Sequence, residues 1–496
     1  MTSFFGNEEI DNFIQERQLN INSSNNVVFE WIPYNQFNEI KETGKNGSIT
    51  VYSEIWKNGP LHKGNWLSNK YTRDSNKEVT LNCLYNLQNP VDSLINEAKK
   101  YSTKNKFLVL YGLSQNPVTN DYILVLTRTS GNEKIDDFIY KMQFKINDSS
   151  DTALEWIPYT QFYEINIAGN GGFAKVYSAK WKDGPLYLKN QSRKYGKRDP
   201  NKRVALKCLN DSQDHITKLL NEVNAYSTKP IYNSILKVYG ISQDPNTKDY
   251  IIVLHYAKDG NFDNWISIND NFKYFNWKEK IQKLNSIVKE LKEIHENQMI
   301  HHDFHTGNIL FDDPIIETYV YISDMGLCGE VGNADKTKIY GVMPYVAPEV
   351  LRGKPYTQAA DIYSLGMIMY YIATERQPFS DCAHDNTLAL NICNDIRPKI
   401  NEQEAPNCYI NLMKKCWDQN PDKRPDANQL LKSLLSISTD NLYKAEIEEA
   451  ENYRILHLPS SKEDRQVNTH PQAIYTSRLL NPFTKDLNSE CLDCAI

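Results

Sequence analysis

The stretch "MIHHDFHTGNILF", residues 299–311, places Asp303 and Asn308 five residues apart, directly after the helical pattern "WKEKIQKLNSIVKELKEIHENQ". The next apolar stretch, "YVYISDMGL", includes Asp324. These three side chains supply what phosphoryl transfer asks of a protein: a carboxylate that accepts the proton of an attacking hydroxyl, and an amide and a carboxylate that hold magnesium. We therefore expect a site in which positioning and charge carry the catalysis.

Segments upstream of residue 299 predict a phosphate-binding part of the same site. "INIAGNGGFAKVYSAKW", residues 165–181, alternates apolar and polar residues on either side of a glycine turn, which predicts a hairpin whose backbone amides can approach an anion. The strand pattern "VALKCL" carries Lys207, and the helical pattern "DHITKLLNEVNAYS" carries Glu222. Together these segments fit a lysine that a helix carboxylate holds against phosphates.

In this order and spacing, the motifs resemble those of the protein kinases. The motifs are "GNGGFAKV", "VALK", Glu222, "HHDFHTGN", "DMG", "APE" (347–349), "DIYSLG" (361–366) and "NPDKRP" (420–425). The resemblance covers about residues 155–436, and "KKCWDQNPDKRP" is similar to the tyrosine-kinase and tyrosine-kinase-like groups. It implies an α+β, bilobal protein kinase fold with a β-rich small lobe and a helical large lobe.

The resemblance also implies roles for individual residues. Asp303 would be the catalytic base, Lys207 would pair the α and β phosphates of ATP with Glu222 as its partner, and Asn308 and Asp324 would bind Mg²⁺. Glu349 would pair with Arg424, Leu254 would be the gatekeeper, and His255–Ala257 would face adenine. The implied nucleotide site comprises Gly169, Gly171, Gly172, Val176, Ala205, Lys207, Leu254, His255, Tyr256, Ala257 and Leu310.

Several positions depart from the family pattern. Met325 replaces the usual Phe of the magnesium motif and can fill the same apolar slot, whereas His302 replaces the Arg that usually precedes the base. His305 stands where Lys is usual, and Val342 stands where Thr is usual. The bond between these last two cannot form because Val has no hydroxyl, although a neutral His305 can donate one hydrogen bond toward a γ-phosphate.

Catalysis by a Ser/Thr kinase in intracellular signalling is therefore the favoured prediction. A nucleotide-binding pseudokinase scaffold and a Tyr or dual-specificity kinase remain the alternatives. The tyrosine-kinase-like resemblance favours Ser/Thr acceptors.

The N-terminal part repeats the small-lobe pattern at an offset of 125 residues. "EVTLNCLYN" at 78 matches "RVALKCLND" at 203, but Asn82 stands in place of Lys207 and Thr80 in place of Ala205. Glu97 remains without that lysine. We expect residues 1–128 to be a truncated, degenerate copy of the small lobe, either regulatory or decayed, followed by the kinase domain at 129–436. Residues 437–496 are expected to form a helix and a mostly disordered tail.

Composition limits the classes of partner. The chain has 496 residues and a net charge of -6, without the basic stripe that nucleic-acid binding needs. No apolar run approaches the roughly 20 residues of a membrane span, and nine Cys without regular spacing suit reduced thiols. We expect a cytoplasmic protein that binds ATP and a protein substrate, without nucleic-acid or membrane contacts. The N-terminal repeat and the C-terminal tail are the candidate surfaces for a protein partner.

Overall fold

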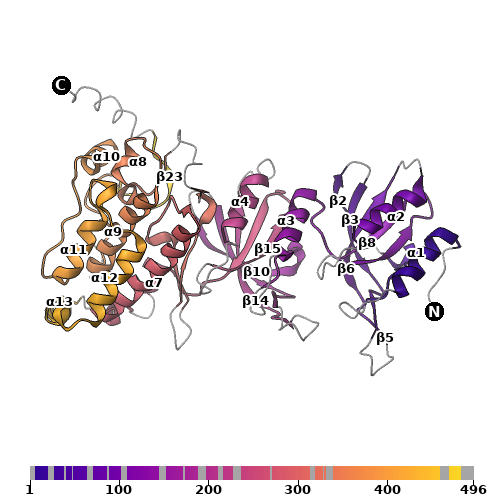
Figure 1. The fold of residues 1–496 in the computed structure, drawn as a ribbon, viewed down its shortest axis with the longest axis horizontal. Coiled ribbons are helices and arrows are strands. Elements are labelled where there is room, and N and C mark those ends of the chain that lie inside the picture. The colour runs from indigo at the N-terminus through magenta and orange to yellow at the C-terminus, as the bar shows by residue number, and fades with distance from the viewer. Residues whose placement is uncertain are drawn as a thin grey trace.

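The computed structural model describes residues 6–19, 27–37, 41–46, 49–63, 71–85, 89–101, 109–144, 152–170, 174–187, 197–209, 216–226, 236–267, 271–312, 319–327, 329–330, 339–458 and 469–481. Two sheet-containing units and one helical unit follow one another along the long axis of the molecule (Figure 1). The Lys207 strand lies in the middle unit and the Asp303 loop lies in the helical unit, so the predicted site spans these two.

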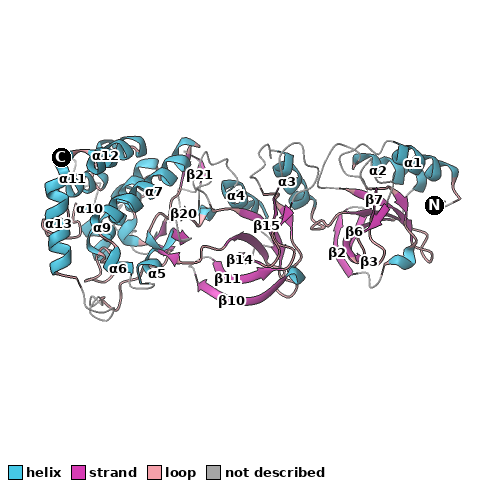
Figure 2. Ribbon diagram, turned by 90° about the horizontal axis from the view of Figure 1, so that it is seen from below, coloured by secondary structure: helices cyan, strands magenta, loops and turns pink. Residues whose placement is uncertain are grey.

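The N-terminal unit is a six-stranded sheet in the order β1-β7-β8-β6-β3-β2. Figure 2 shows its two helices on one side of the sheet. Apolar residues from both helices and from β7 and β8 form one core cluster, which includes Ile10, Leu94 and Leu113. The elements are α1 (Glu8–Leu19), β1 (Glu30–Trp31), η1 (Tyr34–Gln36), β2 (Lys41–Asn46), β3 (Ile49–Trp56), β4 (Leu61–Lys63), β5 (Tyr71–Arg73), β6 (Lys77–Leu84), α2 (Pro90–Lys100), β7 (Leu110–Gln115) and β8 (Tyr122–Leu126).

The middle unit is a second six-stranded sheet, in the order β10-β11-β14-β16-β15-β9, which is the same arrangement of corresponding strands. Val176 lies opposite Lys207 in this sheet, and Val51 lies opposite Asn82 in the first. The elements are α3 (Glu133–Phe144), β9 (Glu155–Trp156), η2 (Tyr159–Gln161), β10 (Phe162–Asn170), β11 (Ala174–Trp181), β12 (Leu186–Tyr187), β13 (Lys197–Arg198), β14 (Lys202–Leu209), α4 (Ile216–Tyr226), β15 (Val238–Gln243) and β16 (Tyr250–His255).

Each sheet contains one parallel pair, and both pairs depend on a glycine. A Cβ on Gly240 of β15 would lie 2.2 Å from the carbonyl oxygen of Glu155, and a Cβ on Gly112 of β7 would lie 2.0 Å from that of Glu30. Any side chain there would push the edge strand away. The two sheets therefore use the same close backbone approach at corresponding positions.

The third unit is helical and packs around α9 (Gln358–Thr374), in which every residue from Ala360 to Ala373 is buried. Asn276 caps α7 (Trp277–Glu296) by accepting a hydrogen bond from the Glu279 amide at 3.0 Å. The remaining helices are α5 (Phe262–Ser267), α6 (Asn271–Tyr274), η4 (Thr306–Asn308), η5 (Met325–Leu327), η6 (Met343–Tyr345), α8 (Pro348–Leu351), α10 (Asn386–Cys393), α11 (Asn407–Cys416), η7 (Pro421–Lys423), α12 (Ala427–Thr439), η8 (Asn441–Tyr443) and α13 (Lys444–Leu456).

Short strands line the helical unit where it faces the middle sheet. One small sheet contains β17 (Gly260–Asn261), β19 (Ile309–Asp312) and β20 (Tyr319–Ile322), and β18 (Met299–Ile300) pairs with β21 (Gly329–Glu330). The predicted ion pair of this unit is confirmed: Arg424 donates to both carboxylate oxygens of Glu349, at 2.7 and 2.8 Å. This bidentate contact ties α8 to the segment before α12.

The C-terminal tail, which we expected to be mostly disordered, contains an ordered segment at residues 469–481. The predicted helix is confirmed as η8 and α13, but further along the chain β23 (Arg478–Leu479) pairs with β22 (Tyr340–Gly341). A strand of two residues leaves no periodic pattern in the sequence, and its stability comes from the surface that it contacts. Leu480, directly after β23, is completely buried.

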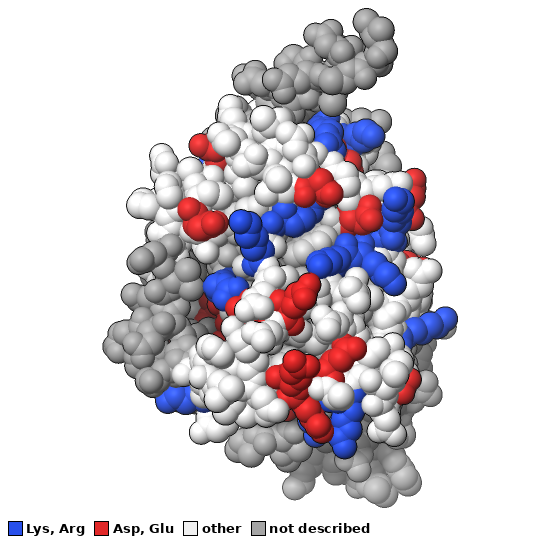
Figure 3. Space-filling view, turned by 90° about the vertical axis from the view of Figure 1, so that its left-hand side faces the viewer, with Lys and Arg blue, Asp and Glu red and all other residues white. Residues whose placement is uncertain are grey.

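Among the described residues, no helix is both long enough and apolar enough to cross a membrane. Lys, Arg, Asp and Glu side chains lie interspersed on the end of the helical unit that Figure 3 shows.

Candidate active site

Lys207 contacts two carboxylates, one from its own lobe and one from the helical lobe. Its Nζ lies 2.5 Å from Oε1 of Glu222 on α4 and 2.6 Å from Oδ1 of Asp324, which follows β20. Burial opposes the positive charge, but the carboxylates of Asp324 and Glu222 outweigh it and hold the pKa of Lys207 well above its ordinary value. The predicted contact between Lys207 and Glu222 is confirmed, and the lysine remains charged.

The backbone after β20 positions Asp324. The amides of Asp324 and Met325 donate to the hydroxyl of Tyr226 at 2.9 and 3.2 Å, so α4 holds this turn directly. Met325 is buried in the core, as predicted for the apolar slot. A Cβ on Gly326 would lie 2.7 Å from Oε2 of Glu222, which explains why a glycine follows Met325.

A buried aspartate on α9 positions the loop that carries Asp303. The Asp361 carboxylate accepts from the amides of His301 and His302 at 2.9 and 3.2 Å and contacts Nε2 of His295 at 2.9 Å. Burial alone would raise the pKa of Asp361, but His295 and His301 outweigh burial and lower it. An ionised carboxylate inside the helical unit therefore fixes the loop.

Asp303 is buried and has a hydroxyl beside it. Asn308 Nδ2 donates to the Asp303 carbonyl oxygen at 2.8 Å, which closes the loop, and the Ser477 hydroxyl donates to Oδ2 of Asp303 at 2.5 Å. Burial alone would raise the pKa of Asp303, but His305 and Ser477 lower it below its ordinary value. Asp303 is therefore ionised, and it already accepts a hydrogen bond from a hydroxyl group.

The His305 ring presents a donor to the same place. Its Nδ1 accepts from the Gly307 amide at 3.1 Å, so in the neutral ring the proton is on Nε2. Nε2 lies 3.3 Å from the Ser477 hydroxyl and 3.7 Å from Oδ1 of Asp303. His305 can therefore donate one hydrogen bond where the family usually has lysine.

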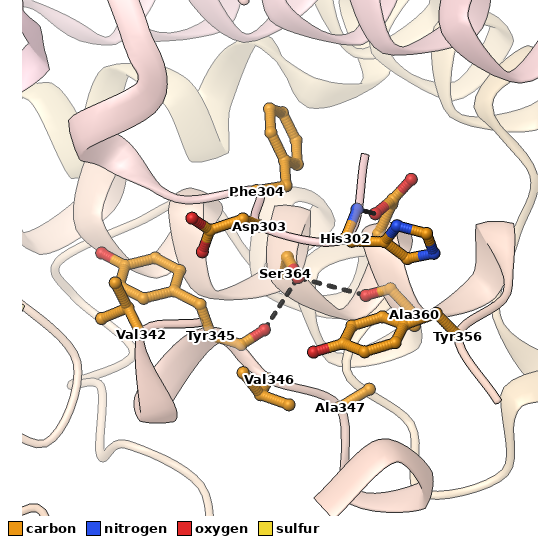
Figure 4. A pocket seen from close by; sticks show the side chains of 11 residues that line it. His302, Asp303, Phe304, Val342, Tyr345, Val346, Ala347, Tyr356, Ala360 and Ser364 are labelled. Carbon is orange, nitrogen blue, oxygen red and sulfur yellow. Dashed lines mark hydrogen bonds between the residues drawn. The ribbon is translucent and has the colours of Figure 1, made fainter. Parts of the chain in front are cut away.

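Val342 forms part of an apolar wall beside the base. A small cavity lies between the loop at 302–304 and the segment at 342–347, and Figure 4 shows the side chains around it. Ser364 on α9 donates to the Tyr345 carbonyl oxygen at 2.7 Å, which fixes the far side. The cavity is lined by His302, Asp303, Phe304, Val342, Tyr345, Val346, Ala347, Tyr356, Ala360, Asp361 and Ser364.

The predicted nucleotide residues lie on adjacent strands of the middle sheet and on the connection to the helical unit. Ala205 of β14 pairs with Leu254 of β16, and Leu254 is buried. His255 Nε2 contacts Oδ2 of Asp312 on β19 at 2.8 Å, which ties the connection at 255–257 to the helical unit. Leu310 of β19 lies opposite Tyr321.

The glycine loop is described only in part. Gly169 belongs to β10, opposite Val176 of β11. Gly171 and Gly172 lie outside the described residues, so their role stays a prediction.

The donors at the predicted metal site fit Mg²⁺. Asn308 uses its amide nitrogen on Asp303, which leaves its carbonyl oxygen to act as a ligand, and Asp324 offers a carboxylate. Mg²⁺ prefers oxygen ligands and commonly takes one or two carboxylates together with substrate phosphates. No group of three His, Cys, Asp or Glu residues in the described part of the chain could hold a metal ion. A site completed by a nucleotide fits this donor set.

Sequence reasoning missed three residues of the site. Tyr226 lies one turn after Glu222 and Asp361 begins a quoted motif, so helical spacing and the motif could have indicated both. Ser477 is 174 residues from Asp303, in a segment without a pattern, and only the fold brings the two together.

A two-lobed fold with a lysine–carboxylate centre and a buried aspartate beside it is typical of a nucleotide-dependent phosphotransferase. Residues 162–435, more than half of the chain, match the family model described as protein kinase domain. The chain belongs to the protein kinase family.

Its relatives carry kinase names. A probable serine/threonine-protein kinase of Dictyostelium discoideum is 28% identical over 276 residues, covering 54% of this chain and 15% of the relative. A putative serine/threonine-protein kinase/receptor of Acanthamoeba polyphaga mimivirus is 28% identical over 276 residues, covering 55% and 15%. An L-type lectin-domain containing receptor kinase of Arabidopsis thaliana is 24% identical over 302 residues, covering 57% and 42%. The chain thus spans less than half the length of each of these relatives.

Proposed function

We propose that this chain is an ATP-dependent protein kinase that phosphorylates Ser and Thr hydroxyls in intracellular signalling, in the cytoplasm. One observation carries the proposal: Lys207 contacts Glu222 and Asp324 at the same time, at 2.5 and 2.6 Å. Kinase catalysis requires both the lysine–glutamate pair and the magnesium aspartate to be in place. Here both meet at Lys207, which is buried together with Glu222, whereas the Asp324 side chain is one-third exposed. The segment "KKCWDQNPDKRP" supports a place for the chain in the tyrosine-kinase-like group.

The residues divide the chemistry between them. ATP with Mg²⁺ supplies the transferable phosphoryl group, with Asn308 and Asp324 as the metal ligands. Lys207 orients the phosphates, and Asp303 accepts the proton of the attacking hydroxyl. His305 Nε2 donates toward the transferred group, because its other ring nitrogen is occupied by Gly307.

The acceptor position favours serine or threonine over tyrosine. The Ser477 hydroxyl reaches Asp303 at 2.5 Å while the next residues pair with β22. A tyrosine hydroxyl lies a whole ring farther from its backbone. A tyrosine acceptor would therefore need the peptide to bind farther from β22.

We also propose that residues 1–128 are a degenerate copy of the kinase small lobe. The order and register of the two sheets support this. Asn82 Nδ2 contacts the Tyr101 hydroxyl at 3.4 Å, at the positions that Lys207 and Tyr226 occupy in the second sheet. Glu97 pairs instead with the exposed Lys100 at 2.6 Å. The copy therefore keeps the shape of the lobe and lacks the phosphate lysine, which suits a partner-binding or regulatory surface.

Saturation binding of a fluorescent ATP analogue tests both proposals together. The full chain is expected to bind one nucleotide, and Lys207→Met is expected to reduce that affinity. Asn82→Glu should leave binding unchanged. Two bound nucleotides per chain would contradict the degenerate-copy proposal, and no bound nucleotide would contradict the kinase proposal.

A further inference from the structure

The segment at 469–481 lies as a strand beside the active site. β23 pairs antiparallel with β22, with Gly341 opposite Arg478 and Tyr340 opposite Leu479. The Leu480 amide extends the pairing by donating to the Ile339 carbonyl oxygen at 2.8 Å, and the Leu480 side chain is completely buried. Backbone pairing and one buried anchor therefore fix the register of the segment after residue 477.

A buried histidine fixes the segment from the other direction. His384 Nδ1 accepts from the Ile474 amide at 3.0 Å, and the His384 backbone amide donates to the Gln472 carbonyl oxygen at 3.1 Å. The Tyr475 ring packs against the His384 ring with centroids 4.9 Å apart. The Arg478 guanidinium donates to the His384 carbonyl oxygen at 2.6 Å. His384 thus contacts the segment both before and after Ser477.

Ser477 lies between these anchors and directly on the base. Its hydroxyl donates to Oδ2 of Asp303 at 2.5 Å and lies 3.3 Å from Nε2 of His305. A general base must lie within hydrogen-bond reach of the proton that it removes, and this contact meets that requirement. Thr476, the neighbouring hydroxyl, is exposed.

We propose that Ser477 is the acceptor of an intramolecular phosphoryl transfer, with residues 469–481 bound in the acceptor-peptide site of their own chain. This inference rests on the proposed kinase function. In the step, Ser477 Oγ forms a bond to the γ-phosphorus of ATP while the bond from that phosphorus to the β,γ-bridging oxygen breaks. The electron pair leaves with ADP, and the hydroxyl proton passes to Asp303.

The product does not suit the site that formed it. A phosphoserine carries a charge of about −1.5 to −2 at neutral pH, and here it would lie beside the buried carboxylate of Asp303. Like charges at this distance repel, so the modified segment leaves and the acceptor site opens to other proteins. Phosphorylation of Ser477 therefore converts a self-occupied enzyme into an open one.

The test uses full-length protein, ATP labelled in the γ-phosphate, and phosphosite mapping. We expect label on Ser477, with a first-order rate that does not change over a 100-fold range of protein concentration. Ser477→Ala should lose that label and Thr476→Ala should keep it. When the Asp303→Asn chain is mixed with the active Ser477→Ala chain, Ser477 of the inactive chain should gain less than a tenth of the wild-type label.

Three results would overturn the inference. The first is a labelling rate that rises in proportion to protein concentration, and the second is full labelling of Ser477 in the mixed sample. The third is an unmodified Ser477 in a chain that phosphorylates myelin basic protein, which leaves the kinase function intact. A chain that labels neither itself nor myelin basic protein would instead contradict the kinase function on which the inference rests.

Discussion

At the scale of single residues, Lys207 and Asn82 occupy corresponding strand positions in the two sheets but have different surroundings. Both lie in the buried middle of their strands, opposite Val176 and Val51. Lys207 is held by two carboxylates, whereas the side-chain nitrogen of Asn82 contacts the Tyr101 hydroxyl. A buried cation needs such partners because its desolvation is costly.

Lys207→Met should reduce both the rate of phosphoryl transfer and the stability of the fold. Loss of a positioned charge is expected to reduce phosphoryl transfer at least about 100-fold. The carboxylates of Glu222 and Asp324 would lose their cation, which should lower the unfolding free energy by about 3 kcal/mol. Lys202→Met is the matched control, since Lys202 lies on the same strand but pairs with the half-exposed Asp199 at 3.1 Å, a contact worth at most about 1 kcal/mol. Denaturant titration and a transfer assay measure both effects, and equal losses in the two variants would contradict the account.

At this scale, the sequence predicted the contact between Lys207 and Glu222, which the structure shows, whereas the chemical roles of the site residues stay predictions. Lys207, Glu222, Asp303, Asn308 and Asp324 could be found because phosphoryl transfer restricts residue type and spacing along the chain. Ser477 could not, since its role depends on a contact across 174 residues. A serine in a polar tail has no local feature that distinguishes it from Thr476.

At the scale of elements, α9 organises the catalytic loop. Asp361, in its first turn, accepts two amides of that loop while remaining almost fully buried. The loop itself contains residues in unusual conformations, such as His302 with φ 69°. Such a backbone persists only where its surroundings fix it.

Asp361→Asn should destabilise the protein by about 3 kcal/mol, because bonds to an ionised acceptor are the stronger ones. The pKa of Asp361 is lowered in the folded state, so its contribution is fully present above the unfolded value of about 3.9. It is lost as pH falls through the folded value. The difference in unfolding free energy between wild type and variant should therefore not decrease from pH 7 to pH 5, because the carboxylate stays ionised there, and a difference that shrinks within that range would contradict the assignment. Asp395→Asn, at an ion pair whose carboxylate is exposed, should change stability by less than about 1 kcal/mol.

The β23 segment gives a second prediction at this scale. Leu480→Asp places a charge at a completely buried position and should release the segment, whereas Leu479→Asp changes a side chain that is 40% exposed. A short tether gives an effective concentration in the millimolar range, so release should lower the KM for an external protein substrate by about tenfold or more while kcat stays unchanged. Equal KM values for the two variants in steady-state assays would show that the segment does not compete with substrate.

Elements with a periodic pattern were predictable, and β23 was not. β14 places apolar residues on both sides of Lys207, so its strand character can be found from sequence. β23 is two residues long and pairs only because Leu480 and the His384 contacts hold the chain beside β22. The position of β23 is determined by the surface of the large lobe and not by a pattern in its own sequence.

At the scale of the whole molecule, the two sheets belong to separate cores. α1 and α2 contribute to one cluster with β7 and β8, whereas α3 and α4 share a cluster with the helical unit. Arg128 lies 3.9 Å from the half-exposed Asp183, a contact between the two sheet units. The repeat in the sequence predicts a duplicated small lobe, and the matching strand orders of the two sheets support that proposal. Whether the proposed copy regulates the kinase depends on energies that no motif encodes.

Deletion of residues 1–128 should leave a folded, active kinase, because no residue assigned to the chemistry lies in that part. If the copy regulates, the deletion should change turnover or nucleotide affinity by the roughly 1–3 kcal/mol typical of coupling between sites. Asn82→Lys, assayed under the same conditions, should change neither turnover nor nucleotide affinity. A fragment that melts cooperatively yet transfers no phosphate would show that the kinase domain needs the N-terminal unit for activity.

The most direct test of the central claim is label transfer from γ-labelled ATP to serine by the purified chain, measured beside Asp303→Asn. The wild type is expected to label serine, and the variant is expected to be slower by about 100- to 10,000-fold. Nucleotide affinity should be nearly equal in the two, because Asp303 contacts the acceptor hydroxyl. Equal labelling by both proteins, or nucleotide binding without any transfer by the wild type, would contradict the assignment of Asp303 as the base of a working kinase.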